Sequence, residues 1–224
     1  IKCGALLDQV GARGCDRRAT GHYAGIAMQE GGYRLRRAKD TRKDQTYFLW
    51  GMPRAALARV VFPLADLTKA SVRALATREG LPVKDKSESQ DICFMSAGGI
   101  GEFLADRGVE LAEGDIVDPS GAVLGRHRGF AAYTIGQRSG LGIAAPNPLY
   151  VLALDATHNR IVAGERHLLL SGGLFAEEVN LLTDDLPRRV LVKIRHTHTP
   201  APATVALADG RLSVRFDTPQ EAVT

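Results

Sequence analysis

The segment that decides the fold of the first part of the chain is LTKASVRALATREGLP at positions 67–82, its clearest helix signal. Thr68 can cap the first turn with its hydroxyl, and Gly80 followed by Pro82 can end the helix. Three apolar residues recur at helical spacing and are expected to form an inner stripe: Val72, Leu75 and Ala76.

Outward from this helix, helical and extended patterns alternate. Leu6, Leu7 and Val10 predict a helix over residues 1–16, and a period of two predicts a strand over 33–37. Ala and Leu content predicts a further helix over 53–61, with Pro53 suited to its first turn. The chain up to about residue 95 is therefore expected to be α/β.

Beyond residue 96 the pattern changes to short strands separated by turn signals. A short helix is expected in GIGEFLADRG at 99–108, followed by β-formers and glycines. PSG at 119–121, THN at 157–159 and DG at 209–210 mark turns between strands. The rear is expected to be all-β, with a second boundary near residue 165.

The charge pattern allows a polyanionic partner without requiring one. The 224 residues hold 29 Lys and Arg against 25 Asp and Glu, a net charge of +4. Three separated basic clusters suit an extended anion such as RNA, although scattered solvated loops explain them equally well. The clusters are Arg34, Arg36, Arg37, Lys39, Arg42 and Lys43; Arg126, His127 and Arg128; and Arg188, Arg189, Lys193, Arg195, His196 and His198.

The three cysteines, Cys3, Cys15 and Cys93, are widely spaced and show no metal-ligand spacing. Their number fits a reducing compartment in which thiols are free or used transiently. Cys93 follows the polar run SESQD and is flanked by Ile92 and Phe94. It can be a buried structural thiol or a nucleophile reached through the polar loop.

Three further motifs carry polar residues where chemistry is possible. In ATGHYA at 19–24, a Gly-His pair can approach a phosphate, or simply form a tight turn with a packed histidine. In KDQTYFL at 43–49, Lys43 can contact a phosphate and Gln45 a base edge, or the stretch can be a polar helix start before core aromatics. In YTIGQRSGLGI at 133–143, a tight loop is expected to offer Gln137 and Arg138 outward. The chain has neither a GxxxxGK[ST] P-loop nor a GxGxxG fingerprint.

The order of the motifs resembles one family. ATGHYA, KDQTYF, GLPVKDKSESQDICF, GAVLGRHRG, YTIGQRSGLGI and KIRHTHTPAPATV follow one another as in the tRNA-specific 2-thiouridylases of the MnmA type. The resemblance implies an α/β remnant of an adenine-nucleotide α-hydrolase-like (PP-loop) domain over 1–95. It further implies a small β-rich central tRNA-binding domain over 96–164 and an incomplete C-terminal β-barrel over 165–224.

The resemblance also implies an activity: ATP-dependent 2-thiolation of the wobble uridine of tRNA in the cytoplasm. The uracil oxygen on carbon 2 is adenylated, a cysteine persulfide delivers sulfur to that carbon, and AMP leaves. The implied partners are tRNA and a sulfur-donor persulfide relay protein, and the cofactor is ATP with Mg²⁺ as its counterion, without a bound metal site or a membrane. By motif match, Cys93 carries the persulfide, Gly21 contacts ATP, and the tRNA contacts are His22, Lys43, Asp44, Gln45, Arg195 and His196.

The chain departs from the family pattern at both ends. The SGGxDS phosphate loop, a second catalytic cysteine and a final PGQ segment are absent from the sequence. The chain alone is therefore expected to be an inactive fragment. A short binding module that holds tRNA or a sulfur carrier is the competing interpretation, whereas other ATP pyrophosphatases do not fit SQDICF and YTIGQR.

Overall fold

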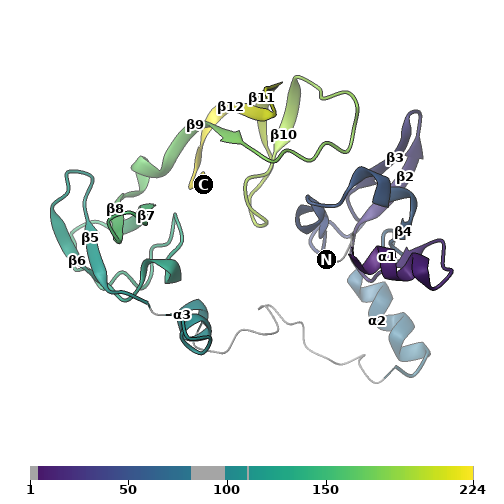
Figure 1. Cartoon of the computed structure of the whole chain (residues 1–224), viewed down its shortest axis with the longest axis horizontal. Helices are drawn as coiled ribbons and strands as arrows, with labels where there is room; N and C mark the ends of the chain where they lie inside the picture. The colour runs from purple at the N-terminus through teal and green to yellow at the C-terminus, as the bar shows by residue number, and fades with distance from the viewer. Residues whose placement is uncertain (1–4, 82–98, 110, 224) are drawn as a thin grey trace.

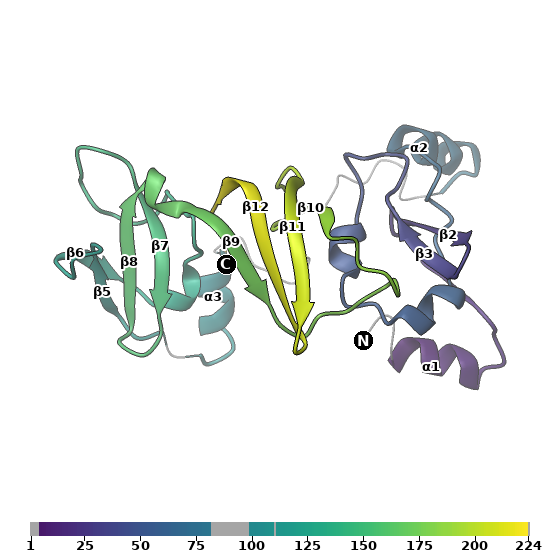
Figure 2. The same ribbon diagram turned by 90° about the horizontal axis from the view of Figure 1, so that it is seen from above.

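The computed structural model describes residues 5–81, 99–109 and 111–223. They form three units, each with a hydrophobic core of its own. In both views the C-terminal sheet, drawn green to yellow, lies between the other two units (Figures 1 and 2). Among the described residues, every helix is too short or too polar to cross a membrane.

The N-terminal unit combines short helices with two small two-stranded sheets. Strand β1 (Arg18–Ala19) pairs in parallel with β4 (Val60–Val61), and β2 (Gly25–Gln29) forms an antiparallel hairpin with β3 (Gly32–Arg36). Helix α1 (Ala5–Ala12) and the 3-10 helices η1 (Thr46–Leu49) and η2 (Arg54–Ala58) surround them. The core contains Leu7, Leu49, Met52, Leu57 and Phe62.

Two expectations for this unit are corrected. The first helix is shorter within the described residues than the 1–16 expected, because it ends at Ala12, before Gly14 with its positive φ of 74°. The expected helix over 53–61 is η2 followed by strand β4. Val60 and Val61 are β-branched, and their pairing with β1 ends the helical turn.

Helix α2 (Lys69–Arg78) is the helix expected from residues 67–82. Thr68 caps it by accepting a hydrogen bond from the Ser71 amide at 3.2 Å, and Gly80 follows it at a positive φ of 65°. The expected inner stripe is wrong, because none of its residues is buried in the described structure and Leu75 is 36% exposed. The helix lies at the periphery of its unit (Figure 1).

The middle unit is a four-stranded sheet in the order β6-β5-β8-β7. The strands are β5 (Gly114–Val117), β6 (Val123–His127), β7 (Leu149–Asp155) and β8 (Arg160–Glu165), and only the β5–β8 pair is parallel. Helix α3 (Gly99–Ala105) packs near the 3-10 helix η3 (Phe130–Ala132). The PSG turn forms as expected, with the Asp118 carboxylate accepting the amides of Ser120 and Ala122.

The C-terminal unit follows the 3-10 helix η4 (Arg166–Leu169). It is an antiparallel sheet in the order β10-β11-β12-β9. Its strands are β9 (Leu170–Ala176), β10 (Arg189–Val192), β11 (Ala201–Ala208) and β12 (Arg211–Glu221). Asp209 and Gly210, at φ 50° and 74°, form the expected two-residue turn. Within the described residues the sheet is open, so the expected barrel is not closed.

The 177–188 loop between β9 and β10 reaches across to the N-terminal unit. Asn180 donates hydrogen bonds to the carbonyls of Trp50 and Met52 at 2.6 and 2.9 Å, and Leu182 packs against the N-terminal core. Arg54 pairs with Asp184, and this hydrogen bond lowers the pKa of Asp184 below its ordinary 3.8. The contact therefore contributes above about pH 4 and is lost as the pH falls through the lowered pKa.

Truncating Ile161 should destabilise the middle unit selectively, because its side chain is fully buried in that core. We expect Ile161→Ala to lower the free energy of unfolding by about 2–5 kcal/mol, from lost burial and the cavity left behind. Urea denaturation followed by circular dichroism measures it. Val123→Ala is the control, because Val123 is 63% exposed in the same sheet and should change stability by less than about 0.5 kcal/mol. Equal losses in the two variants would contradict the described core.

Candidate functional site

Two loops of the N-terminal unit are joined by a reciprocal pair of hydrogen bonds. The Gln45 amide donates to the Tyr23 carbonyl at 2.8 Å, and the Tyr23 amide donates to Gln45 Oε1 at 3.0 Å. The ATGHYA and KDQ motifs, about twenty residues apart, are therefore held side by side. The side-chain oxygen of Gln45, which a paired contact to a base edge would need, is already bonded to the backbone here.

Asp44 is buried beneath this loop and accepts hydrogen bonds from it. Asp44 is only 6% exposed; its Oδ1 accepts the Ala38 amide at 2.8 Å, and its Oδ2 accepts the Thr46 hydroxyl. The Arg37 guanidinium lies 3.6 Å from the same carboxylate. A buried charge is tolerated when it is hydrogen-bonded and paired in this way. The carboxylate predicted to contact tRNA thus binds the Ala38 backbone on one side of Lys43 and the Thr46 side chain on the other.

The other predicted residues of these loops lie closer to solvent. Gly21 is exposed, and a Cβ added there would come no closer than 4.0 Å to Leu64, so the space beside it is open. His22 is half-buried, with its Nδ1 against the Thr20 hydroxyl and its ring edge-on to Phe62 at 6.1 Å. Lys43 is half-buried, and its amide donates to the Asp40 carbonyl at 3.0 Å.

The predicted pair Arg195–His196 lies between β10 and β11 and meets both other units. His196 places its ring 4.6 Å from that of Phe48, which follows the KDQ motif by three residues. The Tyr47 hydroxyl beside it donates to the Ile194 carbonyl at 3.2 Å. A cavity of about 310 Å³ lies at this junction, lined among others by Tyr47 and Lys193.

Arg195 points the other way, towards the middle unit. Its guanidinium donates to the Ile135 carbonyl at 2.8 Å and to the Ala222 carbonyl at 3.3 Å. Two of its donors are therefore used in holding the YTIGQR loop beside the C-terminal strand. The structure gives Arg195 a structural task at the place where the family resemblance puts a tRNA contact.

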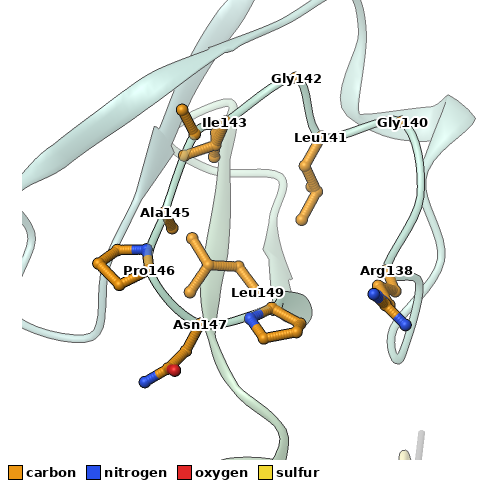
Figure 3. A pocket seen from close by; sticks show the side chains of 11 residues that line it. Arg138, Gly140, Leu141, Gly142, Ile143, Ala145, Pro146, Asn147 and Leu149 are labelled. Atoms are coloured by element: carbon orange, nitrogen blue, oxygen red, sulfur yellow. The ribbon is translucent and has the colours of Figure 1, made fainter.

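The YTIGQR loop lines a surface cavity of about 550 Å³ in the middle unit (Figure 3). Leu141 and Leu149 face its interior, while Arg138 and Asn147 lie at its rim (Figure 3). Arg138 is exposed as expected, but Gln137 is folded back. Gln137 accepts the Thr134 amide at 3.1 Å and donates to the Ser139 carbonyl at 2.9 Å, which closes the tight turn from within.

The cysteines divide between described and undescribed residues. Cys93, the predicted persulfide carrier, and Cys3 lie outside the described residues. Cys15 is free and exposed. The cause is that strand β1 begins only at Arg18, leaving Cys15 in the turn after α1. The described residues contain no group of three or more His, Cys, Asp or Glu that could hold a metal ion.

Sequence reasoning missed the residues that join the units and the cations of α2. Asn180 and Asp184 sit in a loop without any motif, and only the folded chain shows what they contact. Lys69 and Arg73 lie in the helix at 67–82, where they match the K-x-x-VR string of the family resemblance, but the sequence assigned no binding role to them. Their i, i+4 spacing, which puts both on one face of the helix, was the available signal.

Three consecutive family models match the chain. The tRNA methyl transferase HUP domain matches residues 1–97, the tRNA methyl transferase PRC-barrel domain 101–165, and the Aminomethyltransferase beta-barrel domain 171–224. They follow one another in the order of the three structural units and leave few residues between them.

Curated relatives match the whole chain. It is 44% identical to the tRNA-specific 2-thiouridylase MnmA 1 of Syntrophus aciditrophicus and 44% identical to the tRNA-specific 2-thiouridylase MnmA of a Nostoc species. A relative of the same name from Geobacter metallireducens is 46% identical. Each match covers 100% of this chain and 60%, 66% and 62% of the relative, respectively, so the chain spans about three fifths to two thirds of their length. The three domain models and these identities together show that the chain belongs to the MnmA-type family of tRNA-modifying proteins.

Proposed function

We propose that this chain is part of an ATP-dependent tRNA-uridine 2-sulfurtransferase that thiolates the wobble uridine. The observation that carries the proposal is that three motifs of the family resemblance lie next to one another in the folded chain. The GHY and KDQ loops are hydrogen-bonded to each other, and His196 packs against Phe48, three residues after the KDQ motif. The names of the curated relatives support the same reaction.

In this proposal the residues of the joined loops divide into two kinds. Gly21, exposed and open, lies beside ATP, while His22 and Lys43 face the tRNA. Asp44 and Gln45 act as positioning residues, because their side-chain oxygens are bonded to backbone amides of the same unit. His196 continues the tRNA surface from the C-terminal unit.

Cys93 is the proposed persulfide carrier. A carbonyl oxygen on carbon 2 of uracil is a poor leaving group, and ATP, with Mg²⁺ as its counterion, supplies the adenylyl group that makes it a good one. The terminal persulfide sulfur on Cys93 attacks carbon 2, and the C–O bond breaks to release AMP. A second thiol, which the family pattern places outside this sequence, then attacks the Cys93 sulfur: the S–S bond to the transferred sulfur breaks, a disulfide with Cys93 forms, and the transferred sulfur stays on carbon 2.

The setting proposed for this reaction is the cytoplasm, with tRNA and a sulfur-relay protein as partners. We keep the division into catalytic residues 1–95, central residues 96–164 and C-terminal residues 165–224 as part of the proposal. The expectation that the isolated 224-residue chain does not thiolate tRNA stays a prediction, to be checked by assaying the purified chain with ATP, tRNA and a persulfide donor.

Replacing Cys93 by Ser in the full-length protein should abolish wobble-uridine thiolation, because oxygen cannot carry the transferable sulfur. Mass spectrometry of nucleosides from tRNA of complemented cells measures it, and tRNA affinity should stay within about twofold. Cys15→Ser is the matched control and should thiolate normally, since Cys15 is an exposed thiol in a turn. Normal thiolation by Cys93→Ser would leave Cys93 as a structural thiol and favour the binding-module interpretation.

Arg195→Lys separates a structural task from a simple charge contact. Lys keeps the charge but cannot reach both the Ile135 and Ala222 carbonyls, so we expect the free energy of unfolding to fall by about 1–3 kcal/mol. Thermal denaturation and tRNA titration of the 224-residue chain measure both properties. Arg215→Lys is the control and should change neither, because Arg215 is an exposed residue of β12. Unchanged stability with unchanged tRNA binding in Arg195→Lys would make Arg195 a plain phosphate contact.

A further inference from the structure

A further cavity, in the N-terminal unit, has cations at five of its nine lining residues. It has a volume of about 760 Å³ and lies between the 39–43 loop and the first turn of α2. Its charged lining residues are Lys39, Asp40, Arg42, Lys43, Lys69 and Arg73. Of the five cations, Lys43, Lys69 and Arg73 fall in strings that the family resemblance shares, and the resemblance gives a role in tRNA binding to Lys43 alone.

The lining of this cavity carries a large excess of positive charge. Five cations and one carboxylate give its lining a formal charge of +4, which equals the net charge of all 224 residues. The remaining 24 cationic and 24 acidic residues therefore balance. A positive potential concentrated in one hollow attracts anions far more strongly than the same charge spread over the surface.

Some cations of the cluster between Arg34 and Lys43 form salt bridges within the unit, and others face the cavity. Arg36 pairs with Asp66 at 2.8 Å and Arg37 with Asp44 at 3.6 Å, so both are engaged within the unit. Lys39 and Arg42, next along the chain, are exposed in the cavity. Within the described residues, neither Lys39 nor Arg73 forms a salt bridge.

Hydrogen bonds hold the 39–43 loop in place against the start of α2 and the residues before it. Asp40 accepts the Lys69 amide at 3.0 Å, which ties the loop to the start of α2, and the Lys39 amide donates to the Ala65 carbonyl at 2.8 Å. The bond from Lys69 is the main reason that the pKa of Asp40 is lowered, so this carboxylate is ionised at neutral pH. Because the amides of Lys69 and Ser71 are already bonded, the attraction for an anion comes from the side chains.

We propose that this cavity binds backbone phosphates of the tRNA, with Lys39, Arg42 and Arg73 as contacts that the family resemblance does not assign. The inference rests on the proposed function and names a further part of its RNA surface. The lining offers Lys, Arg, Asp, Thr and Ala side chains, so a nucleoside base has no ring to stack on there. Such a site binds the phosphate groups of the RNA backbone and fixes the position of the RNA without recognising its sequence.

The test is the salt dependence of tRNA binding by the 224-residue chain. Each phosphate contact contributes about 0.7–0.9 to the slope of log affinity against log salt, so Arg42→Gln/Arg73→Gln should flatten the slope by roughly 1.4–1.8. Fluorescence anisotropy with a labelled tRNA transcript at several salt concentrations measures it, and circular dichroism checks the fold. The control is Arg78→Gln, because Arg78 lies at the other end of the same helix and pairs with Glu79. Its slope should equal that of the wild type.

The outcomes separate this inference from the proposed function. If the wild-type chain binds tRNA and the double variant keeps its slope, the cavity assignment is wrong while the proposed function stands. If the wild-type chain binds no tRNA, the cavity assignment is wrong, and the proposed function is decided separately by the Cys93→Ser comparison in the full-length protein. Adding ATP distinguishes the source of phosphate: ATP that displaces tRNA from the wild type but not from the double variant would assign the cavity to a free nucleotide instead.

Discussion

The side-chain amide of Asn180 is the contact on which the arrangement of the units depends most directly. By donating to the carbonyls of Trp50 and Met52, it anchors the 177–188 loop to the N-terminal unit. Arg195 does the corresponding task towards the middle unit. Both anchors come from the C-terminal unit, which therefore acts as the connector that sets where the other two present their surfaces (Figure 2).

Within the candidate site, too, some residues serve to position others. Asp44 and Gln45 accept hydrogen bonds from backbone amides within the unit, and Lys43, which precedes them, is the residue of the KDQ motif that lines the cationic cavity. A loop that must present a flexible lysine at a fixed place needs such partners. Short polar motifs can thus be functional without each member touching a ligand.

Local features of the fold could be predicted from the sequence, because they depend on neighbouring residues alone. The Thr68 cap and the Asp209–Gly210 turn are such features. The strand at Val60 and Val61 could not be predicted in this way, since its partner β1 lies about forty residues earlier. Gly21, His22, Lys43, Asp44 and Gln45 could be named from the resemblance, but only packing shows that Asp44 is buried. The roles of Lys69 and Arg73 depend on a loop thirty residues away and emerge only when the chain is folded.

The distance along the chain between the two sides of the Asn180 anchor has a consequence for synthesis. Asn180 lies 130 residues after Trp50. At the ribosome's pace of about 5–20 residues per second, the N-terminal unit waits roughly 7–26 seconds for this partner to emerge. During that interval the apolar surface that later receives Leu182 is uncovered on the nascent chain. This surface is therefore a part of the unit that needs shielding by chaperones until the 177–188 loop has been made.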